Sequence, residues 1–100
     1  MSLEMRFVKV VKVQGVNKNH KVFMYALSTC VWCKRIKQFL KDNDIDHEYV
    51  DVDLESGEER RKIENDLASR ECYVYPALLI DGRRLVKGFN VDEIKEALGL

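Results

Sequence analysis

The chain has 100 residues, with 17 lysines and arginines against 17 aspartates and glutamates, so its formal net charge at pH 7 is zero. This balance gives no reason to expect nucleic acid or an acidic membrane surface as the main partner. The 46% hydrophobic share and the single proline are typical of one packed domain. The longest apolar run, residues 22–27, is far shorter than the ~20 residues that span a bilayer.

The N-terminal segment carries neither a long apolar stretch nor a cleavage site of small residues, so we expect a cytoplasmic protein with reduced thiols. Residues 1–4 resemble an expression scar ahead of a natural start at Met5. Residues 6–14 combine β-prone side chains with lysines, which favours an additional edge strand. We therefore divide the chain into an N-terminal extension, residues 1–20, and a domain over residues 21–100.

Two hydrophobic periods alternate along this domain. Short continuous or alternating apolar runs predict strands, and apolar residues at three- and four-residue spacing predict helices. Strands joined through helices are expected to be parallel and a hairpin is antiparallel, so we expect an α/β fold with a mixed four-stranded sheet flanked by helices. The expected elements, in order, are a strand at 22–27, a helix at 33–43, a strand at 48–52, a helix after Ser56, strands at 77–80 and 84–87, and a helix after Asn90.

Local signals mark where some of these elements begin and end. Ser56 followed by Glu59 is a capping box for the second helix. Asp81-Gly82 is a turn dipeptide between the last two strands, which predicts a β-hairpin. Asn90 is a suitable N-cap for the last helix.

The run Cys30-Val31-Trp32-Cys33 lies between the first strand and the first helix. Positions i and i+3 at a helix start face the same way, within reach of a disulfide. Unpaired amides and the positive end of the helix dipole stabilise a thiolate at Cys30. We therefore expect Cys30 to attack a substrate disulfide and Cys33, shielded deeper in the helix, to resolve the mixed disulfide.

Other interpretations of the cysteines stay open at this point. In one, Cys30 and Cys33 form half of a zinc site that Cys72 and either His20 or His47 complete. In another, both cysteines are inert core residues. In a third, Cys30 from two subunits holds an iron–sulfur cluster together with external thiols.

From about Val22 to its C-terminus the chain resembles a glutaredoxin, a member of the thioredoxin superfamily. The resemblance rests on the strand before the cysteine pair, on Val74-Tyr75-Pro76 ahead of the hairpin, and on Gly88 before the last helix. It implies a thioredoxin-like three-layer fold and a cis peptide bond before Pro76, whereas base rates alone favour trans. It also implies that the backbone of Tyr75 pairs with bound substrate as an added strand.

Several positions depart from the usual glutaredoxin pattern. Val31-Trp32 replaces Pro-Tyr between the cysteines, and Leu27 replaces a lysine that grips glutathione. The run from Gly88 to Asp92 is more similar to that of NrdH-redoxins, which are reduced through thioredoxin reductase instead of glutathione. The resemblance therefore implies a disulfide-containing protein as substrate, and glutathione or a thioredoxin-reductase-type protein as electron donor.

The remaining candidates surround the cysteine pair. Trp32 and Tyr75 offer an aromatic docking surface for a partner. Lysines 34, 37 and 87 are candidates for a basic rim that binds a carboxylate, and we retain Lys87. The predicted substrate-binding set is Thr29, Trp32, Tyr75, Pro76, Lys87, Gly88, Asn90 and Asp92.

Other reactive side chains are expected to have structural roles. We expect Tyr25 and Cys72 in the core, with a third redox thiol as the alternative for Cys72. We expect His20 and His47 to be solvated. Turnover is expected to need no metal or organic cofactor, and the protein is expected to be a monomer.

Overall fold

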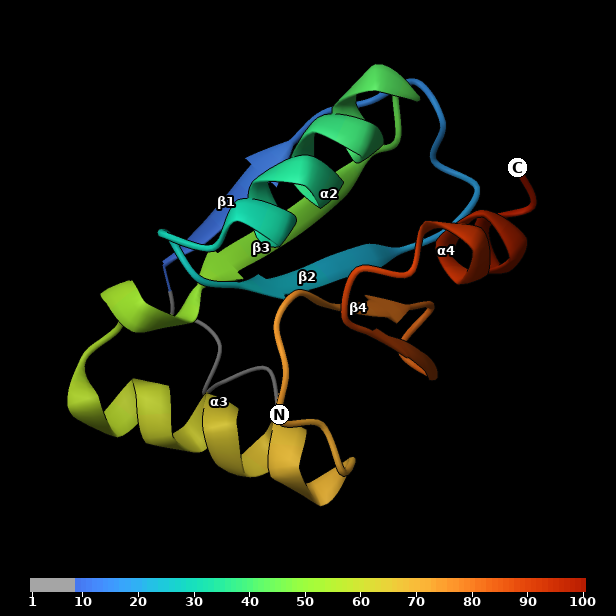
Figure 1. Ribbon diagram of the computed structural model, residues 1–100. Coiled ribbons are helices and arrows are strands. Elements are labelled where there is room, and N and C mark those ends of the chain that lie inside the picture. The colour runs from blue at the N-terminus through green and yellow to red at the C-terminus, as the bar shows by residue number, and fades with distance from the viewer. Residues whose placement is uncertain (1–8) are drawn as a thin grey trace.

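The computed structural model describes residues 9–100 and confirms the predicted alternation of strands and helices (Figure 1). The elements are β1 (Val10–Val13), β2 (Val22–Ala26), α2 (Val31–Asp42), β3 (His47–Asp51), the short 3₁₀ helix η1 (Val52–Leu54), α3 (Gly57–Ser69), β4 (Ala77–Ile80), β5 (Arg84–Lys87) and α4 (Val91–Leu98). No helix in this part of the chain is long and apolar enough to cross a membrane.

The strands form one mixed sheet in the order β1-β3-β2-β4-β5. The strands β2 and β3 are parallel, while the pairs β2–β4, β4–β5 and β1–β3 are antiparallel. At the centre of the sheet, Met24 lies between Tyr49 of β3 and Leu78 of β4. The fifth strand, β1, is the expected edge strand, which extends the four-stranded sheet predicted for the domain. Residues 6–8 of that prediction lie outside the described residues.

Three predicted elements have different bounds in the structure, and one of them, the strand predicted at residues 22–27, ends at Ala26. The first helix begins at Val31, two residues before the predicted start at Cys33. The prediction missed Val31 and Trp32 because both are exposed on the first turn and add nothing to the apolar period. The second strand of the domain runs from His47 to Asp51, and Val52 opens η1 instead of ending the strand. The two strands of the hairpin have the predicted bounds.

Helices cover both faces of the sheet and make three layers (Figure 1). Successive residues of a strand point to opposite faces. In β2, Met24 and Ala26 pack in the core under α2 and α4, whereas Tyr25 packs in the core beside α3. This explains why β2 reads as one continuous apolar run: both of its faces are covered.

The predicted caps and turn are present. The side chain of Ser56 accepts a hydrogen bond from the Glu59 amide, and that of Asn90 accepts one from the amide of Glu93 at 3.1 Å. Asp81 and Gly82 both have positive φ, 57° and 71°, as expected for a tight hairpin turn. These short polar contacts fix where α3, α4 and the hairpin begin.

The segment after β1 is joined closely to the loop between α2 and β3. The Gly15 amide donates to the Asp46 carboxylate at 3.0 Å, and the Asn17 amide donates to the Asp44 carbonyl at 2.9 Å. A β-carbon on Gly15 would stand 2.5 Å from the Asp44 carbonyl oxygen. Only glycine allows this approach of two backbones, so Gly15 holds the N-terminal strand against the domain.

Replacing Gly15 with alanine is therefore expected to lower the free energy of unfolding by about 1–3 kcal/mol, because backbone must move to admit the methyl group. Urea denaturation measures the change. Gly57→Ala is the matched control, since a β-carbon there meets no atom within 4 Å. Equal stability of the two variants would contradict the assigned role of Gly15.

Candidate redox site

Cys30 is the N-cap of α2. Its backbone is extended, with φ −82° and ψ 116°, and its amide donates to the Leu27 carbonyl at 3.1 Å. Its sulfur accepts a hydrogen bond from the Cys33 amide, with the nitrogen and sulfur 3.1 Å apart. The sulfur therefore occupies the position where a helix presents unpaired amides and the positive end of its dipole, which favours the thiolate form of a thiol.

Cys33 has the opposite environment. Its side chain is fully buried, with a relative exposure of 0%, whereas Cys30 is partly exposed. Burial raises the pKa of the Cys33 thiol to about 12, and the hydrogen bond between its side chain and that of Cys30 acts in the same direction. All three cysteines are free thiols in the structure. The pair thus consists of one accessible sulfur and one shielded, protonated sulfur.

Asp53 fixes the loop that carries Cys30, a role that the sequence analysis missed. Its carboxylate accepts hydrogen bonds from the amide of Ser28 at 2.8 Å and from the hydroxyl of Ser28 at 2.5 Å. These bonds lower the pKa of Asp53. A signal for this contact exists in the sequence: Ser28 and Asp53 each follow one of two parallel strands, and the carboxyl ends of parallel strands meet at one edge.

The loop before β4 contains the predicted cis peptide bond, between Tyr75 and Pro76. The carbonyl of Pro76 accepts a hydrogen bond from the Gly88 amide at 2.7 Å. Gly88 has φ 78°, a conformation that favours glycine. Burial is the main cause that raises the pKa of Tyr75, and the thiol of Cys33 is among the groups that also raise it. Tyr75 packs against the buried cluster that contains Cys33.

Exposed aromatic groups lie next to the cysteine pair. Trp32 is 52% exposed and Phe89 is 45% exposed, yet their ring centroids are only 4.8 Å apart. The guanidinium carbon of Arg35 lies 5.3 Å from the centre of the Trp32 ring. Large aromatic side chains that contact each other but stay open to solvent form an apolar surface suited to a protein partner. The sequence analysis named Trp32 but not Phe89 or Arg35.

Other predicted rim residues have additional structural contacts. The Lys87 ammonium donates to the carbonyl of Glu71 at 2.9 Å. Asn90 caps α4, and Asp92 lies exposed in the first turn of that helix. Thr29 is exposed directly before Cys30. The structure thus places these residues at the ends of β5, α4 and α2, and it engages Lys87 and Asn90 in contacts within the chain.

The histidine prediction is wrong for His47, which is only 3% exposed because it lies on β3 beneath α2 and donates from Nδ1 to the Ile45 carbonyl at 2.8 Å. His20 is partly exposed and its Nδ1 lies 2.8 Å from the Asp81 carboxylate. Tyr25 and Cys72 are buried, as predicted. Within residues 9–100, no three His, Cys, Asp or Glu side chains converge as metal ligands. The four residues of the zinc alternative are therefore not brought together.

A CxxC pair at the start of a helix in a thioredoxin-like fold defines a thiol-disulfide redox protein. The chain belongs to the glutaredoxin family, whose model matches residues 22–85. A glutaredoxin-like 8.6 kDa protein of the rubredoxin operon of Clostridium pasteurianum is 38% identical over an alignment of 77 positions, which covers 75% of this chain and 93% of that protein.

Solved structures agree with this assignment. The glutaredoxin of Methanosarcina mazei Go1 superposes with a TM-score of 0.79 at 37% identity, covering 91% of this chain and 88% of that one. Methanoredoxin of Methanosarcina acetivorans superposes with a TM-score of 0.80 at 35% identity, covering 90% and 96%. The family match ends at residue 85, so Lys87 to Asp92 lie beyond it.

Alkylation with iodoacetamide is expected to distinguish the two cysteines. Only a thiolate reacts, and a pKa raised to about 12 leaves Cys33 protonated at neutral pH. In the reduced native protein Cys30 is modified first, and modification of Cys33 becomes appreciable only as the pH rises toward about 12. Peptide mass spectrometry follows both sites. In urea, Cys33 should react as an ordinary thiol with a pKa of ~8.5. Equal rates at the two cysteines in native protein at about pH 8 would refute the assigned environments.

Proposed function

We propose that the protein is a dithiol electron carrier that reduces protein disulfides through Cys30 and Cys33. The observation that carries this proposal is the asymmetry of the pair. The Cys30 sulfur is partly exposed and accepts a hydrogen bond from the Cys33 amide at 3.1 Å, while the Cys33 thiol is buried. An accessible sulfur at a helix N-terminus is suited to nucleophilic attack, and a shielded second thiol is protected from other oxidants.

In the first step, the thiolate of Cys30 attacks one sulfur of the substrate disulfide. The new Cys30–substrate bond forms as the substrate S–S bond breaks, and the other substrate sulfur leaves as a thiolate. In the second step, Cys33 attacks the Cys30 sulfur and releases the first substrate sulfur. The substrate gains two electrons from the cysteine pair and two protons, one from the Cys33 thiol and one from solvent, and the protein is left with a Cys30–Cys33 disulfide.

The raised pKa of Cys33 fits the order of these steps. Two of its causes, the hydrogen bond to the Cys30 side chain and the charge of Cys30, exist only while Cys30 is free. Formation of the mixed disulfide removes both causes, so Cys33 becomes easier to ionise. The charge of Lys37 also favours the Cys33 thiolate. Burial, the largest cause of the raised pKa, persists, so formation of the mixed disulfide lowers the barrier to ionising Cys33 only in part.

Substrate recognition is assigned to the surface around Cys30. The Tyr75 backbone, next to the cis Pro76, would pair with an extended substrate segment. The stacked rings of Trp32 and Phe89 would supply an apolar contact beside it. The other members of this proposed surface are Thr29, Lys87, Gly88, Asn90 and Asp92.

We propose a thioredoxin-reductase-type protein as the electron donor, in a reducing cytoplasmic compartment. Glutaredoxins as a family act on protein disulfides with glutathione-type reductants. In this chain, however, the partly buried Leu27 occupies the position of the family's glutathione-binding lysine, and Lys87 is engaged by the Glu71 carbonyl. The cycle itself uses the two sulfur atoms and no organic cofactor or metal.

Replacing Cys33 with serine is expected to trap the first intermediate. The variant keeps the nucleophile but lacks the thiol that releases the substrate, so a mixed disulfide at Cys30 should accumulate with a disulfide-bonded protein such as insulin. Mass spectrometry under non-reducing conditions identifies the adduct and its cysteine. Cys30→Ser is the matched control and should trap nothing. An adduct at Cys72, or none at all with Cys33→Ser, would refute the proposed roles.

Reduction of the oxidised protein should discriminate between donors. We expect faster reduction by NADPH with thioredoxin reductase than by glutathione with glutathione reductase, because a contact to the glutathione carboxylate is lacking at Leu27. NADPH oxidation at 340 nm measures both rates. The variant Leu27→Lys should raise the glutathione rate. A wild-type rate that is higher with glutathione would contradict the choice of donor but not the dithiol cycle.

A further inference from the structure

Three lysines follow Cys30 along one face of α2. Positions 34, 37 and 41 are four, seven and eleven residues after Cys30. At 3.6 residues per turn, all four positions fall within about 60° of one another around the helix axis. At 1.5 Å per residue, the stripe formed by these lysines extends about 16 Å along the helix from Cys30 to Lys41. The lysines are therefore aligned with the proposed nucleophile.

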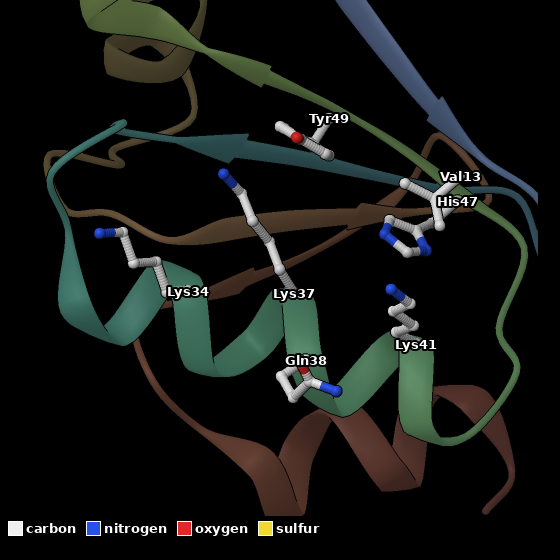
Figure 2. Close-up of a pocket in the computed structure, with 7 residues that line it drawn as sticks. All are labelled: Val13, Lys34, Lys37, Gln38, Lys41, His47 and Tyr49. Carbon is white, nitrogen blue, oxygen red and sulfur yellow. The ribbon is translucent and has the colours of Figure 1, made fainter.

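This stripe borders a groove between α2 and the β3–β1 side of the sheet (Figure 2). Its volume is about 290 Å³. The stems of the lysines form one wall, and Tyr49 and Val13 supply apolar surface opposite them. Figure 2 shows Lys37 rising from α2 toward Tyr49 and Lys41 pointing toward His47, while Lys34 turns toward the loop that leads into α2. The groove consequently has an apolar floor and a cationic rim.

The charges along the groove do not balance. Lys37 pairs with Asp51 at 3.1 Å and lies 4.1 Å from the centre of the Tyr49 ring. Lys34 and Lys41 are exposed, and among residues 9–100 their side chains form no ion pair or hydrogen bond. Asp51 pairs with Lys37, and the Asp42 carboxylate accepts a hydrogen bond from Gln38 at 2.7 Å, so Lys34 and Lys41 are left without an acidic partner in the described part of the chain.

His47 closes the far end of the groove. Its ring is buried on β3, and its Nδ1 is held by the Ile45 carbonyl, so the ring is fixed in place. Of the two acidic residues adjacent to His47, Glu48 points to the other face of the strand, where it pairs with Lys12 at 3.7 Å, and Asp46 accepts a hydrogen bond from the Gly15 amide at 3.0 Å. Neither carboxylate therefore forms an ion pair with Lys41.

We propose that this lysine groove binds an acidic segment of the disulfide partner while Cys30 attacks its disulfide, an inference that rests on the proposed function. The groove begins about one helical turn after Cys30, because Lys34, which lines it, is four residues further along the chain. An extended segment advances ~3.3 Å per residue, so about five residues span the stripe. Carboxylates two and five residues from the attacked cysteine would then reach Lys34 and Lys41.

The test uses two disulfide-linked peptide dimers. One carries glutamates two and five residues from the cysteine on both sides, and the other carries glutamines there. The reduced full-length protein should reduce the acidic peptide with a kcat/KM about three- to tenfold higher, as expected for two partly exposed ion pairs. Raising NaCl from about 50 to about 500 mM should remove most of this preference, because salt screens surface charges.

The double variant Lys34→Gln/Lys41→Gln should bring the acidic-to-neutral ratio close to one. Lys62→Gln/Lys95→Gln is the control of equal charge, on exposed positions of α3 and α4, and should keep the wild-type ratio. A ratio near one in the wild-type protein, or one that the control variant reduces equally, would overturn the lysine groove while leaving the dithiol cycle intact. Failure to reduce either peptide would overturn the proposed function and this inference together.

Discussion

The hydrogen bond from the Cys33 amide to the Cys30 sulfur is the contact on which the site depends. An N-cap position usually holds an oxygen-bearing side chain. In this protein a sulfur takes that position, so the group that begins α2 is also the group proposed to react. The turn of helix that exposes the first sulfur also places the second in the core under the sheet. Helix capping, the exposure of Cys30 and the burial of Cys33 therefore have one structural cause.

The fold was largely predictable because its elements have clear periods. The two-sided burial of β2, the capping residues Ser56 and Asn90, and the hairpin turn at Asp81-Gly82 each left a local pattern, and each appears in the structure. Exposed residues caused the error at the start of the first helix: Val31 belongs to α2 but contributes nothing to its apolar face. His47 was misjudged because its burial depends on the packing of α2 across β3, which no local pattern reports.

The site was predictable where its residues are adjacent in sequence and less so where the sheet brings them together. The cysteine motif and the proline loop stand out in the sequence. The support of Ser28 by Asp53, 25 residues later, arises from two parallel strands that end at the same edge. The stacking of Trp32 on Phe89, and the engagement of Lys87 by the Glu71 carbonyl, join segments that approach each other only in the folded chain.

The position of the third cysteine, Cys72, affects which disulfides the folded protein can form. Cys72 is buried with the side chains of α3, whereas Cys33 is buried with those of α2 and α4, on the other face of the sheet. The sheet therefore separates the Cys72 thiol from the thiols of Cys30 and Cys33. In the proposed cycle the intramolecular disulfide is therefore Cys30–Cys33, because the folded sheet keeps Cys72 away from this pair.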